Sequence, residues 1–244
     1  KKLAAEENQR KKLQHLVDER TRELAMQNEQ LTQLNQELEA AHTTDALTGA
    51  KSRYFLDIYL KSHLSTLETP ENTQKMLVLL MDLDNLKPVN DSLGHAAGDA
   101  IIVHFSQMLK AIVPETFHIV RWGGDEFMIV GLVDDSQTSV DLVKTLSKAV
   151  DEAVFTWFNQ TLSLSCSMGF AHYPFDDAYR QALSWDQVSM LADKAMYSAK
   201  EDDSLCWCGV MGSKREINEL YISELMRCQR IFQVEDLVEL LLSR

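Results

Sequence analysis

The sequence predicts an α/β domain, in which helices cover a sheet, preceded by one long helix. Three observations lead to this prediction. Residues 1–42 contain no glycine or proline and repeat apolar residues every seven positions, the apolar run MLVLLM at 76–81 ends in acids, and strand-like runs alternate with helical spacing from 43 to about 210. The chain has 244 residues, of which 45% are hydrophobic, which is enough for one good-sized domain with extensions.

The N-terminal segment, 1–42, has the heptad pattern of a coiled coil. The apolar seam consists of Val17, Leu24, Leu31 and Leu38 at position a and Leu13, Leu34 and Ala41 at position d. Polar residues interrupt it at Arg10, Arg20 and Gln27, which lowers stability but can fix the register or permit switching between packings. We expect a parallel two-stranded coil that makes the chain a homodimer. A solvated single helix is the alternative.

The segment 43–210 is expected to form the main domain. In chain order the patterns predict a buried strand MLVLLMDLD at 76–84, a helix at 96–113, a hairpin at 118–133 around Gly123 and Gly124, a helix at 140–158, a strand at 162–173 and a helix at 185–200. After Gly212, apolar residues recur at spacings of three and four. We therefore expect 211–244 to be a helical extension that docks or dimerises. A free amphipathic helix is the alternative.

Charge and composition exclude some functions. The formal net charge of −13 argues against nucleic acid as the main partner, because no basic surface is available to displace counterions. The longest aliphatic run is too short for a membrane span, and we expect a cytoplasmic protein with free thiols at its four cysteines. The chain begins inside a helical pattern without methionine, so we expect it to be a fragment that lacks an upstream sensor and any membrane anchor.

Acids gather where two predicted strands end. Asp82 and Asp84 close the strand at 76–84, and Asp125 and Glu126 follow the glycine pair of the hairpin. If the first hairpin strand lies beside the Asp82 strand, the turn brings these carboxylates together, and they repel one another unless a divalent cation neutralises them. Oxygen ligands suit Mg²⁺ held against substrate phosphates. The alternative for any single aspartate is a turn-forming role.

Such a site predicts metal-assisted attack on a phosphorus atom. The cation can lower the pKa of an attacking hydroxyl and neutralise a leaving pyrophosphate, and Lys87 and Lys200 are candidates to share the phosphate charge.

Several motifs in this order resemble those of the GGDEF family, the diguanylate cyclases. They are GGDEF at 123–127, DALTG at 45–49 before Arg53, DLDNLKPVND at 82–91, GHAAGD at 94–99, Ser167-Met168-Gly169 and DKAMYSAK at 193–200. The resemblance implies a nucleotide-cyclase-like fold with a central, mostly antiparallel sheet flanked by helices. It also implies that two GTP are joined into cyclic di-GMP with release of two pyrophosphates.

The resemblance implies a role for each matched residue. Asp82, the carbonyl of Leu83 and Asp125 would hold Mg²⁺, with Mn²⁺ possible, and Glu126 would help to activate the ribose 3′-hydroxyl. The amides of Asn85 and Leu86 would contact the phosphates, and Lys87 would stabilise developing charge. Asn90 and Asp99 would bind guanine, and His95 would line the pocket. A carboxylate at Asp99 suits guanine because it accepts from N1–H and N2–H, a pairing that adenine does not offer. The alternative for His95 is a packing role at the start of a helix.

The chain departs from the family pattern at two functional positions. Ser204 stands where the family has a phosphate-clamping arginine, after the acids Glu201, Asp202 and Asp203. We expect a raised KM without loss of chemistry. The R-x-x-D product-inhibition motif is replaced by Pro114, Glu115, Thr116 and Phe117, so we expect no feedback through that site.

Smaller departures are Leu86 for phenylalanine and Ser52 for asparagine, and both are expected to be tolerated. Two other functions stay open at this point: a catalytically silent nucleotide-binding or interaction module, and a cyclase with relaxed base choice.

Overall fold

The computed structural model describes residues 2–202, 204–212 and 217–243, with side chains from residue 10 onward except those of 35–41. The chain divides into two compact units, 1–43 and 44–244. The first is helix α1, Lys2–His42. Its predicted seam residues are exposed where their side chains are described, including Leu24 at 60% and Leu31 at 57%. The side chains of two further predicted seam residues, Leu38 and Ala41, are not among those that the structure describes.

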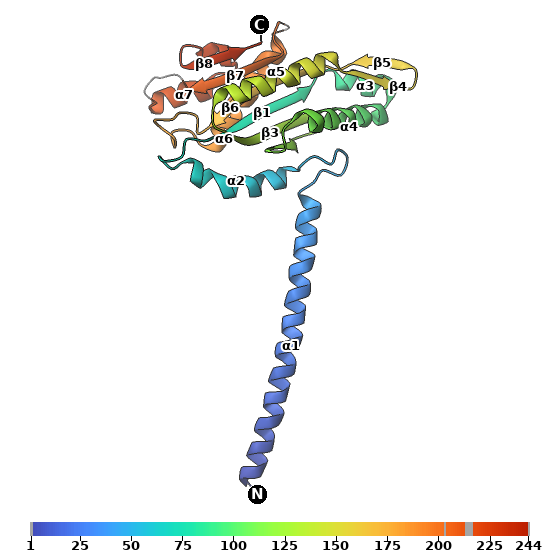
Figure 1. The fold of residues 1–244 in the computed structure, drawn as a ribbon, viewed down its shortest axis with the longest axis vertical. Coiled ribbons are helices and arrows are strands. Elements are labelled where there is room, and N and C mark those ends of the chain that lie inside the picture. The colour runs from blue at the N-terminus through green and yellow to red at the C-terminus, as the bar shows by residue number, and fades with distance from the viewer. Residues whose placement is uncertain (1, 203, 213–216, 244) are drawn as a thin grey trace. The chain divides into compact units, whose positions relative to one another are not determined.

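The second unit combines eight described strands with helices on both faces of a sheet (Figure 1). Its helices are α2 (Arg53–Leu67), α3 (Leu86–Leu93), α4 (His95–Ile112), α5 (Ser136–Glu152), α6 (Trp185–Glu201), α7 (Glu219–Arg227) and the 3₁₀ helix η1 (Ile231–Val234). Its strands are β1 (Lys75–Leu83), β2 (Phe117–Arg121), β3 (Glu126–Val133), β4 (Val154–Trp157), β5 (Gln160–Ser163), β6 (Cys166–Tyr173), β7 (Trp207–Gly212) and β8 (Val238–Leu242).

The main sheet has six strands in the order β2-β3-β1-β6-β7-β8. All neighbours are antiparallel except β6 and β7, and β4 pairs with β5 in a separate hairpin. The predicted class, a central and mostly antiparallel sheet flanked by helices, is confirmed. β1 lies in the middle, so both neighbours of its last residues come from other parts of the chain.

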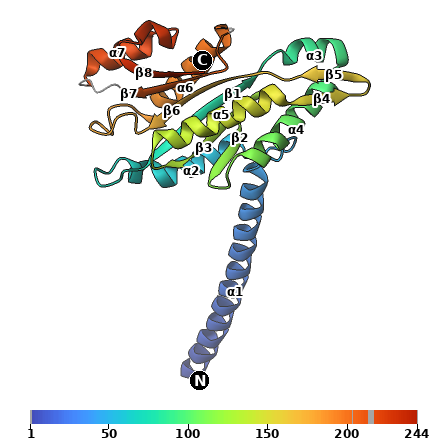
Figure 2. The same cartoon turned by 45° about the horizontal axis from the view of Figure 1, so that its top comes forward.

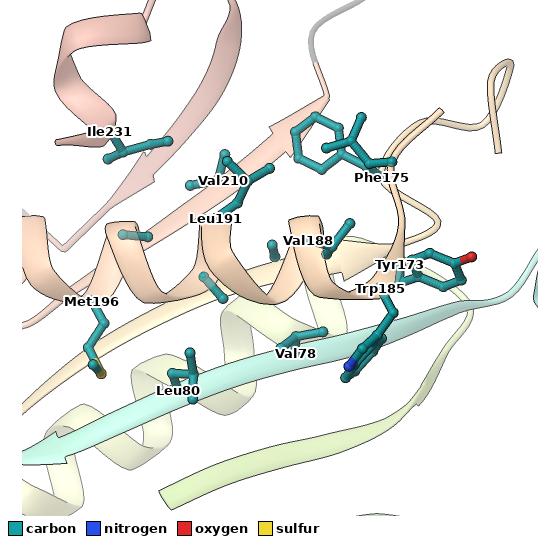
Figure 3. Close-up of a cluster of buried hydrophobic side chains, with 14 of the residues drawn as sticks. Val78, Leu80, Tyr173, Phe175, Trp185, Val188, Leu191, Met196, Val210 and Ile231 are labelled. Atoms are coloured by element: carbon teal, nitrogen blue, oxygen red, sulfur yellow. The ribbon is translucent and has the colours of Figure 1, made fainter. Parts of the chain in front are cut away.

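Alternation along β1 sends side chains into two separate cores. Leu77 and Leu79 belong to the core that also contains buried residues of α4 and α5. These two helices cover one face of the sheet in Figures 1 and 2. Val78 and Leu80 point toward α6 on the other face, where Val188 and neighbouring side chains fill the space in Figure 3. Burying apolar surface on both faces makes β1 rigid at the point where its acids begin.

Helix α6 packs unusually close to β6. A Cβ added to Gly169 would lie only 2.0 Å from the backbone nitrogen of Met196, so the approach requires glycine at this position. Ser184 caps the start of α6 with a capping box, because its hydroxyl accepts from Gln187 N while the Gln187 side chain accepts from Ser184 N. The cap and the close approach together fix where the far end of α6, with Lys200, lies over the sheet.

The structure corrects several predicted elements. The expected helix at 140–158 ends at Glu152, and the expected strand at 162–173 is divided into β5 and β6 by a break at 164–165. The segment 211–244 is not wholly helical, because β8 follows α7 and η1 and pairs with β7. Its buried residues join the α6 core, among them Leu225, Ile231 and Val238. Within the described residues, no helix combines the length and apolar character needed to cross a bilayer.

Candidate active site

The acids of two strands meet at the end of β1. Asp82 stands opposite Glu126 on β3 and opposite Ser167 on β6. The neighbour of the Asp82 strand is therefore the second strand of the hairpin, β3, and not the first, whose pairing was the condition for the predicted meeting of acids. The correction leaves the predicted meeting of carboxylates intact, because β3 begins directly at the turn. The turn residue Asp125 is tied to β1 by a hydrogen bond of 3.3 Å from Leu83 N to its carbonyl.

Lys200, at the end of α6, contacts this edge directly. Its Nζ lies 2.7 Å from Asp82 Oδ1, across 118 positions of sequence. Burial alone would lower the pKa of Lys200, but the hydrogen bond and charge of Asp82, followed by the charges of Asp84 and Asp125, raise it above its usual value. The lysine thus remains charged amid the carboxylates it faces.

Glu126 is surrounded by the charges of other carboxylates. Burial and the charges of Asp82, Asp125 and Asp193 raise the pKa of its carboxyl, against the opposing charge of Arg53. A raised pKa brings a carboxylate closer to the range of a general base. The same repulsion makes the edge a favourable place for a divalent cation.

The GGDEF turn is held by hydrogen bonds from both sides. Trp122 N and Gly123 N donate to Glu126 O at 2.8 and 3.2 Å, which closes the hairpin. Arg121 donates from Nη2 to Gly124 O at 2.8 Å and from Nη1 to Asp45 at 3.1 Å. Through Arg121, the segment before α2 therefore helps to hold the half-buried turn in place, in addition to the backbone hydrogen bonds of the turn itself.

A second arginine supports the same turn from α2. Arg53 Nε donates to Trp122 O, and its guanidinium lies 4.4 Å from the centre of the Trp122 ring. This role of Arg53 is not predictable from its place in a motif alone. The motif DALTG at 45–49, just before Arg53, was the sequence signal that this segment belongs to the site.

The loop after β1 leads into α3. Ser167 Oγ donates to Asp84 Oδ1 at 3.0 Å, and Asp84 N donates to Ser165 O at 3.0 Å. Asn85 then takes a left-handed conformation, with φ 59°, and Leu86 is buried as the first residue of α3. A cleft of about 430 Å³ lies here, and its wall includes Asp84, Asn85 and Lys200.

A second group of predicted residues gathers between α3 and α4. Asn90 lies against Gly98, where an added Cβ would be 2.0 Å from Asn90 Oδ1. That oxygen is buried and has no hydrogen-bond partner among the described residues. A buried acceptor without a partner is costly, so an incoming donor is favoured at this position. Asp99 follows Gly98 on α4 and is exposed.

Other predicted residues lie apart from the carboxylates. Lys87 and His95 are exposed at the starts of α3 and α4, and neither bonds to the acids in the described part of the chain. Ser204 Oγ donates to Asp202 Oδ1 at 2.6 Å, and Ser204 N donates to the same oxygen at 3.0 Å. Asp203, between them, lies outside the described residues.

Asp193 is an acid that the sequence reasoning left without a role. It stands two turns before Lys200 on α6, and its charge raises the pKa of Glu126. Burial and the charge of Asp82 raise the pKa of Asp193 itself, against the charge of Lys194. The seven-residue spacing to Lys200 was the available signal, because it puts both side chains on one face of a helix.

The donor set at this edge fits Mg²⁺. Within the described residues, no three His, Cys, Asp or Glu side chains are gathered tightly enough to hold a metal by themselves. Mg²⁺ is commonly bound through one or two carboxylates together with waters and substrate phosphates. The mutual repulsion at Glu126 is what a cation between these acids would relieve.

This fold and carboxylate edge are those of a GGDEF domain. A family model described as the GGDEF domain of diguanylate cyclases matches residues 42–204, and the chain belongs to this family. Diguanylate cyclase A of Treponema denticola is 26% identical over 180 residues, covering 73% of this chain and 45% of that protein. The chain thus spans less than half the length of that curated relative.

Solved structures agree with the assignment. A sensory box/GGDEF family protein from Caulobacter crescentus has a TM-score of 0.56 at 30% identity, over 65% of this chain and 98% of that one. The coiled coil and GGDEF domain of DgcB from the same organism, in complex with c-di-GMP, has a TM-score of 0.60 over 78% of this chain and 94% of that one. At 22% identity, the second likeness concerns the fold alone.

Proposed function

We propose that the chain condenses two GTP into cyclic di-GMP with release of two pyrophosphates. The observation that carries this proposal is the meeting of Asp82, Glu126 and Lys200 at one end of the central strand, in a chain of the GGDEF family. Incubation with GTP and Mg²⁺, with the product identified by mass, tests it. ATP in a parallel incubation tests the relaxed-base alternative, for which we expect no product.

Asp82, the carbonyl of Leu83 and Asp125 would hold Mg²⁺ or Mn²⁺. When bound, the cation would lower the pKa of the ribose 3′-hydroxyl and would neutralise charge on the leaving pyrophosphate. Glu126 takes the hydroxyl proton, and its raised pKa supports this role. Lys200 and Lys87 stabilise charge on the phosphates.

The substrate lies between this edge and the α3–α4 pair. The amides of Asn85 and Leu86 donate to phosphates at the start of α3, where a helix N-terminus favours anions. Guanine is read by Asn90 and Asp99, and the orphaned Asn90 Oδ1 accepts from a guanine N–H. His95 lines the pocket from the start of α4.

The reaction needs two copies of the chain. Each domain holds one GTP, so a two-fold partner must present the second 3′-hydroxyl. The exposed apolar seam of α1, which includes Val17, Leu24 and Leu31, supports a coiled-coil homodimer. An upstream sensor would act by changing the packing of this coil.

The dimer is tested by replacing the seam. We expect Leu24→Ser with Leu31→Ser to make the chain monomeric in sedimentation and to lower its turnover at low protein concentration. Serines at the exposed Gln14 and Glu29, outside the predicted seam, serve as the matched control. Full activity of a monomeric seam variant would contradict the dimer.

A silent interaction module is the second candidate. It is favoured by Ser204, which bonds to the carboxylate of Asp202 where the family has a cation. The intact set of Asp82, Asp125 and Glu126 opposes it. GTP binding without any cyclic product in the incubation above would establish the module instead.

A further inference from the structure

The two edges of the main sheet are covered differently. At the β2 edge, the segment before α2 pairs with the strand, because Lys51 N donates to Ile119 O and Arg121 N donates to Lys51 O, each at 2.8 Å. At the β8 edge, no residue of the described ranges pairs with the outer side of Val238–Leu242. An open edge presents backbone groups that readily pair with another strand, so proteins commonly cover or bend such edges or place lysine or proline there. β8, with the sequence VELLL, has no lysine or proline.

The free backbone groups of β8 belong to alternate residues. Ser243 N donates to Trp207 O at 3.2 Å, and an antiparallel ladder alternates between residues that bond inward and residues that face away. In this register Glu239 and Leu241 bond to β7. The N–H and C=O groups of Val238, Leu240 and Leu242 therefore point outward, at the spacing of an added strand.

A groove follows β8 on the side of η1. We call this cavity of about 910 Å³ the η1-side groove. Its apolar wall includes Phe232, Leu240 and Leu242, and its acids are Glu235 and Asp202. The groove therefore offers both apolar surface and carboxylates to an entering side chain. Lysine and arginine match this combination, because their methylene stems pack on apolar surface while their charged heads reach polar groups.

A second groove follows the opposite face of β8. This cavity of about 420 Å³, the α5-side groove, is lined by Leu241, Met211, Trp207 and Val140, together with Glu239 and Lys144 of opposite charge. Its lining favours an apolar side chain. The two faces of β8 thus differ in the residue type they accept.

We propose that β8 is a docking edge for an extended segment of a partner protein, which adds a seventh strand and carries lysine or arginine alternating with apolar residues. Backbone pairing supplies affinity, and side chains entering the two grooves in turn supply specificity. The exposed acids Glu235, Asp236 and Glu239 lie at this edge of a chain whose net charge is −13. This charge favours a basic partner over a second copy. The inference does not depend on the cyclase activity.

The test uses the whole chain and a fluorescein-labelled synthetic peptide, GRVRLRVRG. We expect it to bind saturably and to protect the amides of Val238, Leu240 and Leu242 from hydrogen exchange. The peptide GRPRLRPRG keeps the charge but loses backbone pairing, because proline lacks the donor and does not fit a paired strand, and it is expected not to bind.

Charge-reversed variants separate specific docking from general attraction. Glu235→Lys with Glu239→Lys should weaken the peptide about tenfold or more, as loss of complementary charges does. The matched control, Glu71→Lys with Glu115→Lys, makes the same change of net charge at exposed sites outside both grooves and should bind like the unmodified chain.

Three results of the binding experiments would overturn the proposal. They are equal binding of the proline peptide, equal weakening by the control pair, and absence of any binding by GRVRLRVRG. Amides of β8 that are already protected in the free protein, increasingly so at higher concentration, would also overturn it and assign the edge to a second copy.

Discussion

Lys200 Nζ lies 2.7 Å from Asp82 Oδ1 and joins the end of α6 to the end of the central strand. The Asp82 side chain is only 15% exposed, whereas that of Lys200 is 42% exposed. The carboxylate is therefore fixed by the sheet, and the lysine is the partner that can move. We expect Lys200 to turn to the phosphates when a cation shares the charge of Asp82.

The pKa of Glu126 predicts a dependence of stability on pH. Its carboxyl has a higher pKa in the folded chain than its ordinary value of 4.5, chiefly through burial and then through Asp82, Asp125 and Asp193. The stabilisation from such a group is complete below the unfolded pKa and is lost as pH rises through the folded pKa. Ionised Glu126 therefore opposes folding at neutral pH.

Removing this charge should stabilise the fold while stopping the reaction. We expect Glu126→Gln to raise the melting temperature by about 1–3 °C near pH 7, and the difference to vanish near pH 4. Added Mg²⁺ should narrow the gap near pH 7. Glu115→Gln, at an exposed turn, is the control. If Glu126→Gln were less stable than the unmodified chain near pH 7, the other carboxylates would not destabilise ionised Glu126 as we infer.

Placing an arginine at position 204, where the family has one, should tighten GTP binding. Ser204→Arg supplies a charge-assisted contact worth about 1.5–3 kcal/mol, so KM for GTP should fall about tenfold or more while kcat stays unchanged. Ser204→Ala removes the hydrogen bond from Ser204 Oγ to Asp202 without adding charge, and should leave KM near that of the unmodified chain. Steady-state kinetics measure both variants. An unchanged KM with arginine would mean that another group already fills this role.

Gly98 should control the position of Asn90. An alanine methyl would lie 2.0 Å from Asn90 Oδ1, so Gly98→Ala must displace the side chain that we assign to guanine. We expect KM for GTP to rise by about tenfold, the size of one lost hydrogen bond. In an Asn90→Ala background the same change should have no further effect on KM. Additive effects of the two substitutions would contradict the positioning role.

The chain should not respond to its product through the family's inhibitory motif. Pro114 O accepts from Phe117 N at 2.9 Å, and the four residues 114–117 form a turn that contains no arginine. Initial rates measured with added cyclic di-GMP at low micromolar concentration should equal those without it. A fall in rate at that concentration would show a product site elsewhere on the chain.

Strong local patterns made part of the fold predictable. β1 was visible as an apolar run because it is buried on both faces, and α4 because its apolar residues keep helical spacing. β8 was missed because Val238 to Leu242 continues an apolar spacing that also suits a helix, and only pairing with β7 makes it a strand. α3 is short and contains Pro88, which hid its helical pattern.

The candidate site was predictable to the extent that its motifs are local. Acids at strand ends indicated a metal edge, but which hairpin strand adjoins Asp82 depends on sheet order, which spacing does not encode. The contact of Lys200 with Asp82, and that of Arg121 with Asp45, join residues far apart in sequence. Such contacts follow from the packing of α6 and of the segment before α2.

Formation of cyclic di-GMP from GTP and Mg²⁺ by matched aspartate variants tests the central claim most directly. The unmodified chain and the control Asp57→Asn, on the exposed side of α2, should form the product. Asp82→Asn and Asp125→Asn should lose at least about a hundredfold in rate, as removal of groups that stabilise transition-state charge does, while both variants still unfold in one cooperative transition. A folded Asp82→Asn or Asp125→Asn variant with the unmodified rate, or an unmodified dimer that forms no product, would contradict the account.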